Sequence, residues 1–259
     1  VFATTKIIHM RGSKFTMILL LSLVAARAAE IETHGVESEC QTLKQSSVGD
    51  VPTAAQGNPV AVVADIPETE IATLRQEISG IHTLTSAVKK RRACKTIIRK
   101  GNSLVDASPE ASNRYRILAI VLQSHRRLLA LDNSDRNREA LFQTCATLAK
   151  APDEYANLRL EADFILMEKE MSLKGADLKE RTQVLTDLIE RYRDTPAEVK
   201  SLIMANLIAP KLEAVELEAQ INNAMDERFA GNLDIIEWRR AHRDYAYFRL
   251  GFKGTFTRL

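Results

Sequence analysis

The sequence predicts an all-α protein in which helices pack as an array of antiparallel pairs. Its 259 residues include only 10 glycines and 7 prolines, and aromatic residues make up 5% of the chain. Hydrophobic residues reach 45%, which is enough for a large core. From about residue 67 to residue 248 the apolar residues recur at intervals of three and four, the spacing of one helix face. Few turn-forming residues and this period together disfavour a turn-rich all-β fold.

Signals for helix starts divide this region into nine predicted helices. At residues 195–198, "TPAE" places a hydroxyl at the N-cap, a proline at the first helical position and a glutamate three residues on, which is a capping box. "DLKE" at 177–180 repeats the pattern with a carboxylate, and "SPEA" at Ser108 and "APDE" at Ala151 each put a proline in a first turn. The predicted helices cover residues 67–79, 83–106, 109–131, 134–149, 152–174, 177–193, 196–209, 211–229 and 232–248.

Connections of two to five residues indicate that successive helices pack as antiparallel neighbours. Helix pairs of about 34 to 45 residues are typical of an α-solenoid similar to the tetratricopeptide repeats. No Trp/Gly/Tyr/Ala/Pro consensus recurs from pair to pair, so the repeat prediction rests on architecture alone. A compact helical bundle remains the alternative fold.

The predicted helix 109–131 is apolar over a wide arc, so we expect it at the centre of the domain. Its two adjacent stripes are Tyr115, Leu118, Leu122, His125 and Leu129, and Ile117, Val121, Leu128 and Leu131. No second histidine or carboxylate lies one turn from His125 on this face. His125 is therefore expected to be a hydrogen-bonded core residue rather than a metal ligand.

The first 28 residues have the pattern of a secretory signal peptide. Lys6, Arg11 and Lys14 precede the apolar run "FTMILLLSLVAA" at 15–26, and "ARA" at 26–28 suits signal peptidase. The run is too short to span a bilayer easily, which disfavours the alternative of a permanent membrane anchor. We expect cleavage after Ala28 and a periplasmic or secreted protein with no stable membrane span.

Removal of residues 1–28 would leave 32 Lys and Arg against 34 Asp and Glu, a net charge near −2. This balance argues against a nucleic-acid partner. Residues 29–65 are polar, small and proline-containing without any period, and we expect a mostly disordered linker there. The helical domain is then residues 66–248, followed by a tail at 249–259.

Three cysteines give no redox or zinc motif, because none lies two or three residues from another. Cys94 and Cys145 fall on apolar helix faces, where a free cysteine packs as a small hydrophobic residue. A disulfide between Cys94 and Cys145 is the alternative. Cys40 lies in the predicted linker and is the more exposed thiol.

The sequence contains no phosphate loop, zinc-protease motif, nucleophile elbow or calcium loop, and we predict no catalytic, cofactor or metal site. The densest positive stretch is "KKRRACK" at 89–95. On a helix these charges spread over a broad arc without an interleaved aromatic residue, which favours a solvated face over an anion site. The carboxylates of "EADFILMEKEM" are likewise interpreted as charges on a helix surface.

The chain ends on "GFKGTFTRL", in which Phe252, Gly254 and Phe256 alternate as in a strand. We expect residues 249–259 to form a short β-strand without a partner strand in this chain. Trp238, Tyr245 and Phe248 on the last predicted helix, together with Phe252 and Phe256, form a candidate docking surface for an adjoining domain. The alternative, which we favour, is that these aromatic residues cap the helical core.

Two segments, "RRACKTIIRK" through "EADFIL" at 91–166 and "ERYRDTPAEVKSLIMANLIAPKLEA" at 190–214, resemble the N-terminal helical region of secreted planctomycete-type proteins that carry a thioredoxin-like (redoxin) domain. In those proteins a phrase similar to "FKGTFTRL" opens the β-structure that follows. The resemblance implies a redox domain beyond the helices. The CxxC or peroxidatic cysteine of that domain is absent here, so no catalytic residue is carried over.

The sequence thus predicts an exported helical scaffold that binds other proteins, or an adjoining domain, in the cell envelope and needs no cofactor. One alternative is the front part of a thiol-disulfide oxidoreductase or peroxidase. A weaker alternative is a binder of small molecules or carbohydrates.

Overall fold

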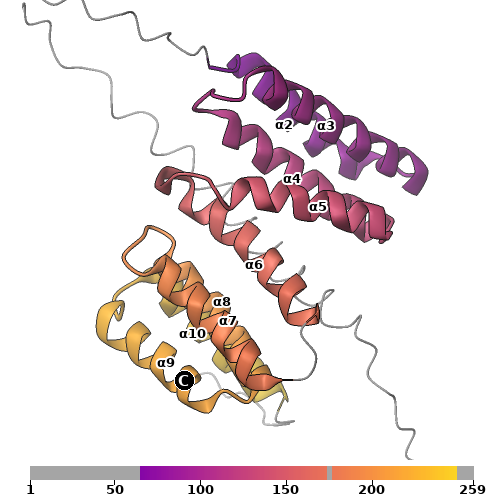
Figure 1. The fold of residues 1–259 in the computed structure, drawn as a ribbon. Helices are drawn as coiled ribbons and strands as arrows, with labels where there is room; N and C mark the ends of the chain where they lie inside the picture. The colour runs from indigo at the N-terminus through magenta and orange to yellow at the C-terminus, as the bar shows by residue number, and fades with distance from the viewer. Residues whose placement is uncertain (1–64, 174–176, 250–259) are drawn as a thin grey trace, which may run out of the picture. The chain divides into compact units, whose positions relative to one another are not determined.

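The computed structural model describes residues 65–173 and 177–249, and every regular element in these ranges is helical (Figure 1). The all-α class predicted from the sequence is confirmed for this part of the chain. The predicted signal peptide, the linker as far as residue 64, and the strand-like tail from residue 250 lie outside the described residues.

Within the described ranges the chain forms nine α-helices and three short 3-10 helices, in the order that the sequence predicts. The α-helices are α2 (Glu68–Gly80), α3 (Ala87–Ala107), α4 (Arg114–Leu131), α5 (Asp135–Leu148), α6 (Ala156–Leu173), α7 (Leu178–Tyr192), α8 (Glu198–Ile208), α9 (Val215–Arg228) and α10 (Leu233–Arg249). The 3-10 helices are η1 (Ile81–Thr83), η2 (Asp153–Tyr155) and η3 (Ala209–Leu212). From α2 to α9 each helix packs against the next one in the chain, whereas α10 packs against α8.

The central position predicted for the helix at 109–131 is confirmed, because α4 contributes to two separate core clusters. One side of α4 packs with α2 and α3, and the other side packs with α5 and α6. The first side contributes Ile117, Ile120, Val121 and Leu128, and the second contributes Tyr115, Leu118 and Leu122. A helix buried on two sides holds its neighbours together through hydrophobic contacts on both.

The start of α4 differs from the prediction, since the helix begins at Arg114 and residues 108–113 form turns. A contact with the chain before α2 explains the difference. The Asn113 side chain accepts a hydrogen bond from the Ile66 amide (3.0 Å) and donates one to the Ile66 carbonyl (2.8 Å). Asp65 accepts hydrogen bonds from the Ser112 amide (3.1 Å) and hydroxyl (2.8 Å). These contacts hold residues 112 and 113 outside the helix, so the proline signal does not set the boundary.

The start of α8 is also shifted, from the predicted Pro196 to Glu198. The Thr195 hydroxyl still accepts a hydrogen bond from a backbone amide, that of Ala197 (3.3 Å). The Glu198 carboxylate, however, accepts from the Asp194 amide (2.7 Å) rather than from the threonine. The predicted N-cap of α7 is confirmed, because the Asp177 side chain accepts from the Lys179 amide (2.9 Å).

Helices α3 and α4 approach closely at Gly101, which is buried. A Cβ atom added there would lie 2.5 Å from Cγ2 of Val121 and 3.3 Å from Cγ2 of Ile117. Both neighbours are β-branched and buried, so neither can turn aside easily. The glycine therefore sets how closely the two helices pack.

We expect Gly101→Ala to lower the free energy of unfolding by about 1–2 kcal/mol. Overpacking of a core lowers the free energy of unfolding by about 1–3 kcal/mol, and the higher helix propensity of alanine offsets up to about 1 kcal/mol of this loss. Urea unfolding followed by circular dichroism measures the change. Gly80→Ala is the matched control, because nothing lies within 4 Å of a Cβ at that position. Equal stabilisation in both variants would contradict the close approach.

Candidate functional site

Helix α6 lies between two groups of helices, with α5 on one side and α7 on the other. Its buried residues are therefore spread around the helix rather than along one stripe. They are Ala156, Leu160, Ala162, Asp163, Phe164, Met167 and Met171. A helix in this position must satisfy any charged group that it carries into the interior.

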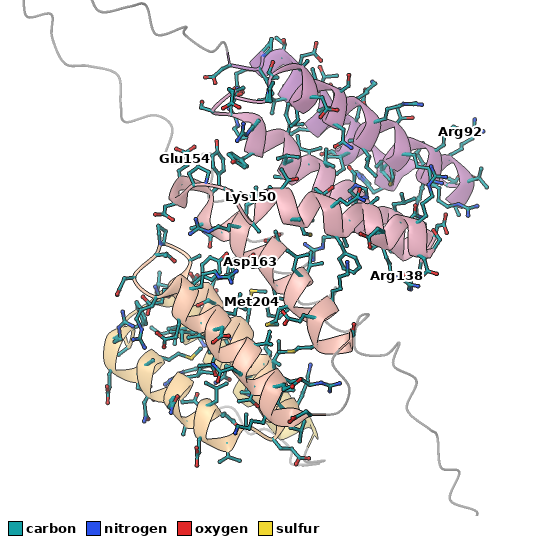
Figure 2. All side chains as sticks on the ribbon, in the orientation of Figure 1. Arg92, Arg138, Lys150, Glu154, Asp163 and Met204 are labelled. Atoms are coloured by element: carbon teal, nitrogen blue, oxygen red, sulfur yellow. The ribbon has the colours of Figure 1, made fainter. Side chains whose placement is uncertain are left out.

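Asp163, labelled in Figure 2, is the one charged residue in this set, and 5% of its surface is exposed. One of its carboxylate oxygens accepts a hydrogen bond from the Tyr192 hydroxyl (2.7 Å) and one from the Arg191 guanidinium (3.1 Å). The guanidinium of Arg159 lies over the Tyr192 ring, 5.5 Å from its centroid. Burial and the contact with Asp163 raise the pKa of Tyr192, so its hydroxyl keeps the proton that it donates. This network fixes the end of α7 on α6.

Glu161 links α6 to two further helices. Its carboxylate accepts a hydrogen bond from Lys200 of α8 (3.2 Å) and lies 3.6 Å from the guanidinium of Arg126 on α4. Glu168, two turns along, is partly buried, and this burial raises its pKa to about 7, against a smaller lowering by Lys211 and Arg126. Glu168 therefore titrates near neutral pH.

A groove of about 370 Å³ runs between α6 and α7 and is the candidate functional site. It is lined by Asp163, Leu166, Met167 and Glu170 from α6, and by Glu180, Gln183, Val184, Asp187, Leu188 and Arg191 from α7. On each helix these positions follow the spacing of one face, so two parallel stripes form the walls. We call this feature the α6–α7 groove.

The α6–α7 groove combines an apolar floor with an acidic rim. Leu166 and Val184 are partly exposed on the floor, and three exposed carboxylates, Glu170, Glu180 and Asp187, stand at the rim. Arg191 is the one cation among the lining residues, and its guanidinium is already paired with Asp163. The groove therefore presents apolar surface and, at Glu180 and Asp187, negative charge to a ligand.

A second hollow, of about 400 Å³, lies between α2 and α3. Its lining residues are Glu70, Thr73, Leu74, Arg99, Lys100, Ser103 and Leu104. Charges of both signs surround it, and Leu74 is the one lining residue that is fully apolar and buried. A hollow of this kind specifies no ligand chemistry, so the α6–α7 groove is the stronger candidate despite its smaller volume.

Cys94 and Cys145 are both buried free thiols, and they lie in different core clusters. The structure forms no disulfide between them. Burial raises the pKa of Cys145 to about 12 and also raises the pKa of Cys94. Both therefore remain protonated and pack as small hydrophobic residues.

His125 is buried as predicted, but the prediction of a hydrogen bond is wrong, because its side chain forms none within the described residues. No polar group reaches Nδ1, and 3% of the residue's surface is exposed. Burial without a partner lowers the pKa of His125 to about 4. The neutral imidazole is thus accommodated as a core residue with one unsatisfied nitrogen.

The candidate docking surface is described only at Trp238. Its indole Nε1 donates a hydrogen bond to the Ile203 carbonyl of α8 (3.3 Å), and its ring contacts His242, with 4.1 Å between centroids. Trp238 therefore helps to hold α10 on α8. The side chains of Tyr245 and Phe248, and all of Phe252 and Phe256, lie outside the part of the chain that can be described.

In the described ranges, no group of three or more His, Cys, Asp or Glu side chains is placed to hold a metal ion. No helix in the same ranges combines the length and apolar character needed to cross a membrane. Comparisons of the chain with protein-family models, with curated proteins and with solved structures found no match.

The sequence does not predict the groove: it indicates surface charges for Asp163 and Glu170 and a helix start for Glu180. Two signals point to it. The acidic and apolar residues of 163–170 and of 180–191 each occupy one helix face, and the connection between the two helices is short. What the sequence does not show is that these two faces meet.

Titration of His125 should weaken the fold in acid. Its pKa is about 6.5 in an unfolded chain and about 4 in the folded protein, so the unfolded state binds more protons between these values. Stability is therefore lost as the pH falls from 6.5 to 4, by about 3 kcal/mol in all. Urea unfolding at several pH values should show a smaller acid loss in His125→Leu.

Glu168→Gln provides the control of opposite sign. The folded pKa of Glu168 is raised from 4.5 to about 7, so its contribution to stability falls as the pH rises through this window. Glu168→Gln should therefore steepen the net rise in stability between pH 4.5 and 7, whereas His125→Leu should flatten it. Parallel profiles for the two variants would contradict the assignment.

Proposed function

We propose that this protein is an exported helical scaffold without a catalytic centre of its own, and that its α6–α7 groove binds a segment of a partner protein. The observation that carries the proposal is the pairing of an apolar floor with an acidic rim along two helix faces. Grooves between adjacent helices commonly receive amphipathic segments. A tetratricopeptide-like arrangement of the helix pairs, and a location in the cell envelope, are part of the same proposal.

The chemistry of the groove specifies the segment. Apolar side chains at helical spacing would cover Leu166 and Val184, with the buried Met167 and Leu188 beneath them. Methionine is flexible and adapts to differently shaped side chains. Lysine or arginine residues beside the apolar stripe would face the acidic rim, where opposite charges favour encounter and orientation. The expected ligand is thus a basic amphipathic helix or extended segment.

The state of the thiols supports a scaffold rather than a redox enzyme for the described part of the chain. A nucleophilic cysteine needs an accessible thiolate with a lowered pKa. Cys94 and Cys145 have the opposite properties, since both are buried and both pKa values are raised.

A displayed library of 15-residue peptides tests this function. We expect the enriched peptides to carry Lys or Arg beside apolar residues spaced three or four apart, with affinity measured by fluorescence anisotropy. The double variant Glu180→Lys/Asp187→Lys should lose at least about tenfold in affinity, since both rim charges become repulsive.

The matched control is Glu216→Lys/Glu227→Lys, which makes the same charge change at two exposed positions of α9. It should stay within about threefold of the unaltered protein, as expected for charges beyond the reach of the ligand. Peptides that bind both double variants equally well would show that the groove is not the site.

A further inference from the structure

The charges of the domain are divided between two successive groups of helices. Residues 65–150, which contain α2 to α5, carry 15 Lys and Arg against 9 Asp and Glu, a formal net charge of +6. Residues 151–249, which contain α6 to α10, carry 14 Lys and Arg against 20 Asp and Glu, a formal net charge of −6. The positive part of one copy is therefore electrostatically complementary to the negative part of another copy.

The positive charge is concentrated on the outer face of α3. Lys89, Arg92, Lys95 and Arg99 are all exposed there, and Arg99 also borders the hollow between α2 and α3. The other face of the helix packs on α2 and α4. Arg92 extends from α3 away from the neighbouring helices (Figure 2). Within the described ranges neither Arg92 nor Arg99 forms an ion pair, and Lys95 reaches Asp132 only at 4.0 Å. Val88, one turn before Arg92, is 56% exposed.

The spacing of the α3 charges matches that of the groove rim. Arg92 and Arg99 are seven residues apart, as are Glu180 and Asp187, and seven residues span about 10.5 Å of helix. An α3 helix laid along the α6–α7 groove would therefore bring its two arginines opposite the two rim carboxylates at the same time. The aliphatic stem of Lys95 would lie between them, over the apolar floor.

We propose that the partner of the α6–α7 groove is a second copy of this chain, which presents the outer face of α3. This inference rests on the proposed function and names its partner. The contact joins two different surfaces, so each copy keeps one unused surface and copies add head to tail. Because the pairs are exposed to solvent, association is weak at high ionic strength and strengthens as salt is removed.

Sedimentation velocity of the full chain over a range of concentrations, at about 0.02 M and about 0.5 M NaCl, tests the proposal. The weight-average mass should rise with concentration at low salt and stay that of the monomer at high salt. Arg92→Glu/Arg99→Glu, called the α3 variant, and Glu180→Lys/Asp187→Lys, called the groove variant, should each remain monomeric. When the two variants are mixed in equal amounts, they should associate again. The unaltered α3 face of the groove variant can then bind the unaltered groove of the α3 variant.

Two control variants separate specific docking from general attraction. Arg136→Glu/Lys150→Glu makes the same charge change as the α3 variant at exposed cations of and beside α5, and Glu216→Lys/Glu227→Lys matches the groove variant. Both controls should associate like the unaltered protein. The proposal is overturned if they lose association as the two site variants do, or if the mixed site variants stay apart.

The outcomes also separate this inference from the proposed function. Peptides that bind the groove of a protein that stays monomeric at every concentration would overturn the second copy as partner and leave the groove's function standing. Failure of both experiments would overturn both. Binding of the monomeric protein to vesicles of anionic lipid, lost in the α3 variant, would assign the α3 face to a membrane surface and overturn the proposal.

Discussion

The arrangement of the domain depends on one constraint: the carboxylates that α6 carries into the interior must be paired. This helix is covered on both sides, yet it carries Glu161, Asp163 and Glu168 toward its neighbours. A buried carboxylate without a partner costs several kcal/mol, and a paired one fixes the position of whatever it pairs with. Asp163 holds the end of α7, and Glu161 joins α4 to α8. The helices after α6 are thus positioned by polar contacts as well as by apolar packing.

The sequence was informative where local rules decide the outcome and uninformative where distant residues do. The 3.6-residue period located nine helices in the described part of the chain and identified α4 as the central one. Proline signals placed the starts of three helices, α4, α6 and α8, too early. At α4 the cause is the bond between Asn113 and Ile66, 47 positions apart, which competes with helical geometry and which no local pattern reveals.

The candidate site shows the same division. Each wall of the α6–α7 groove is visible in the sequence as an acidic and apolar stripe, but a stripe of this kind is equally typical of a solvated face. Only the packing of α7 on α6, through Asp163 and Tyr192, turns two surface stripes into one groove. For His125 the sequence predicts burial correctly, because burial follows from the apolar helix face. It does not predict that Nδ1 lacks a hydrogen-bond partner, because that depends on the neighbouring helices.

The close approach at Gly101 has a consequence on the opposite side of α3. Arg92 lies nine positions before Gly101, and at 100° per residue this places the arginine directly across the helix axis from the glycine. The distance between α3 and α4 at Val121 therefore determines how far the outer charges of α3 lie from the other helices. Gly101 thus determines where the charged face of α3 lies and which way it points, although it has no contact with that face.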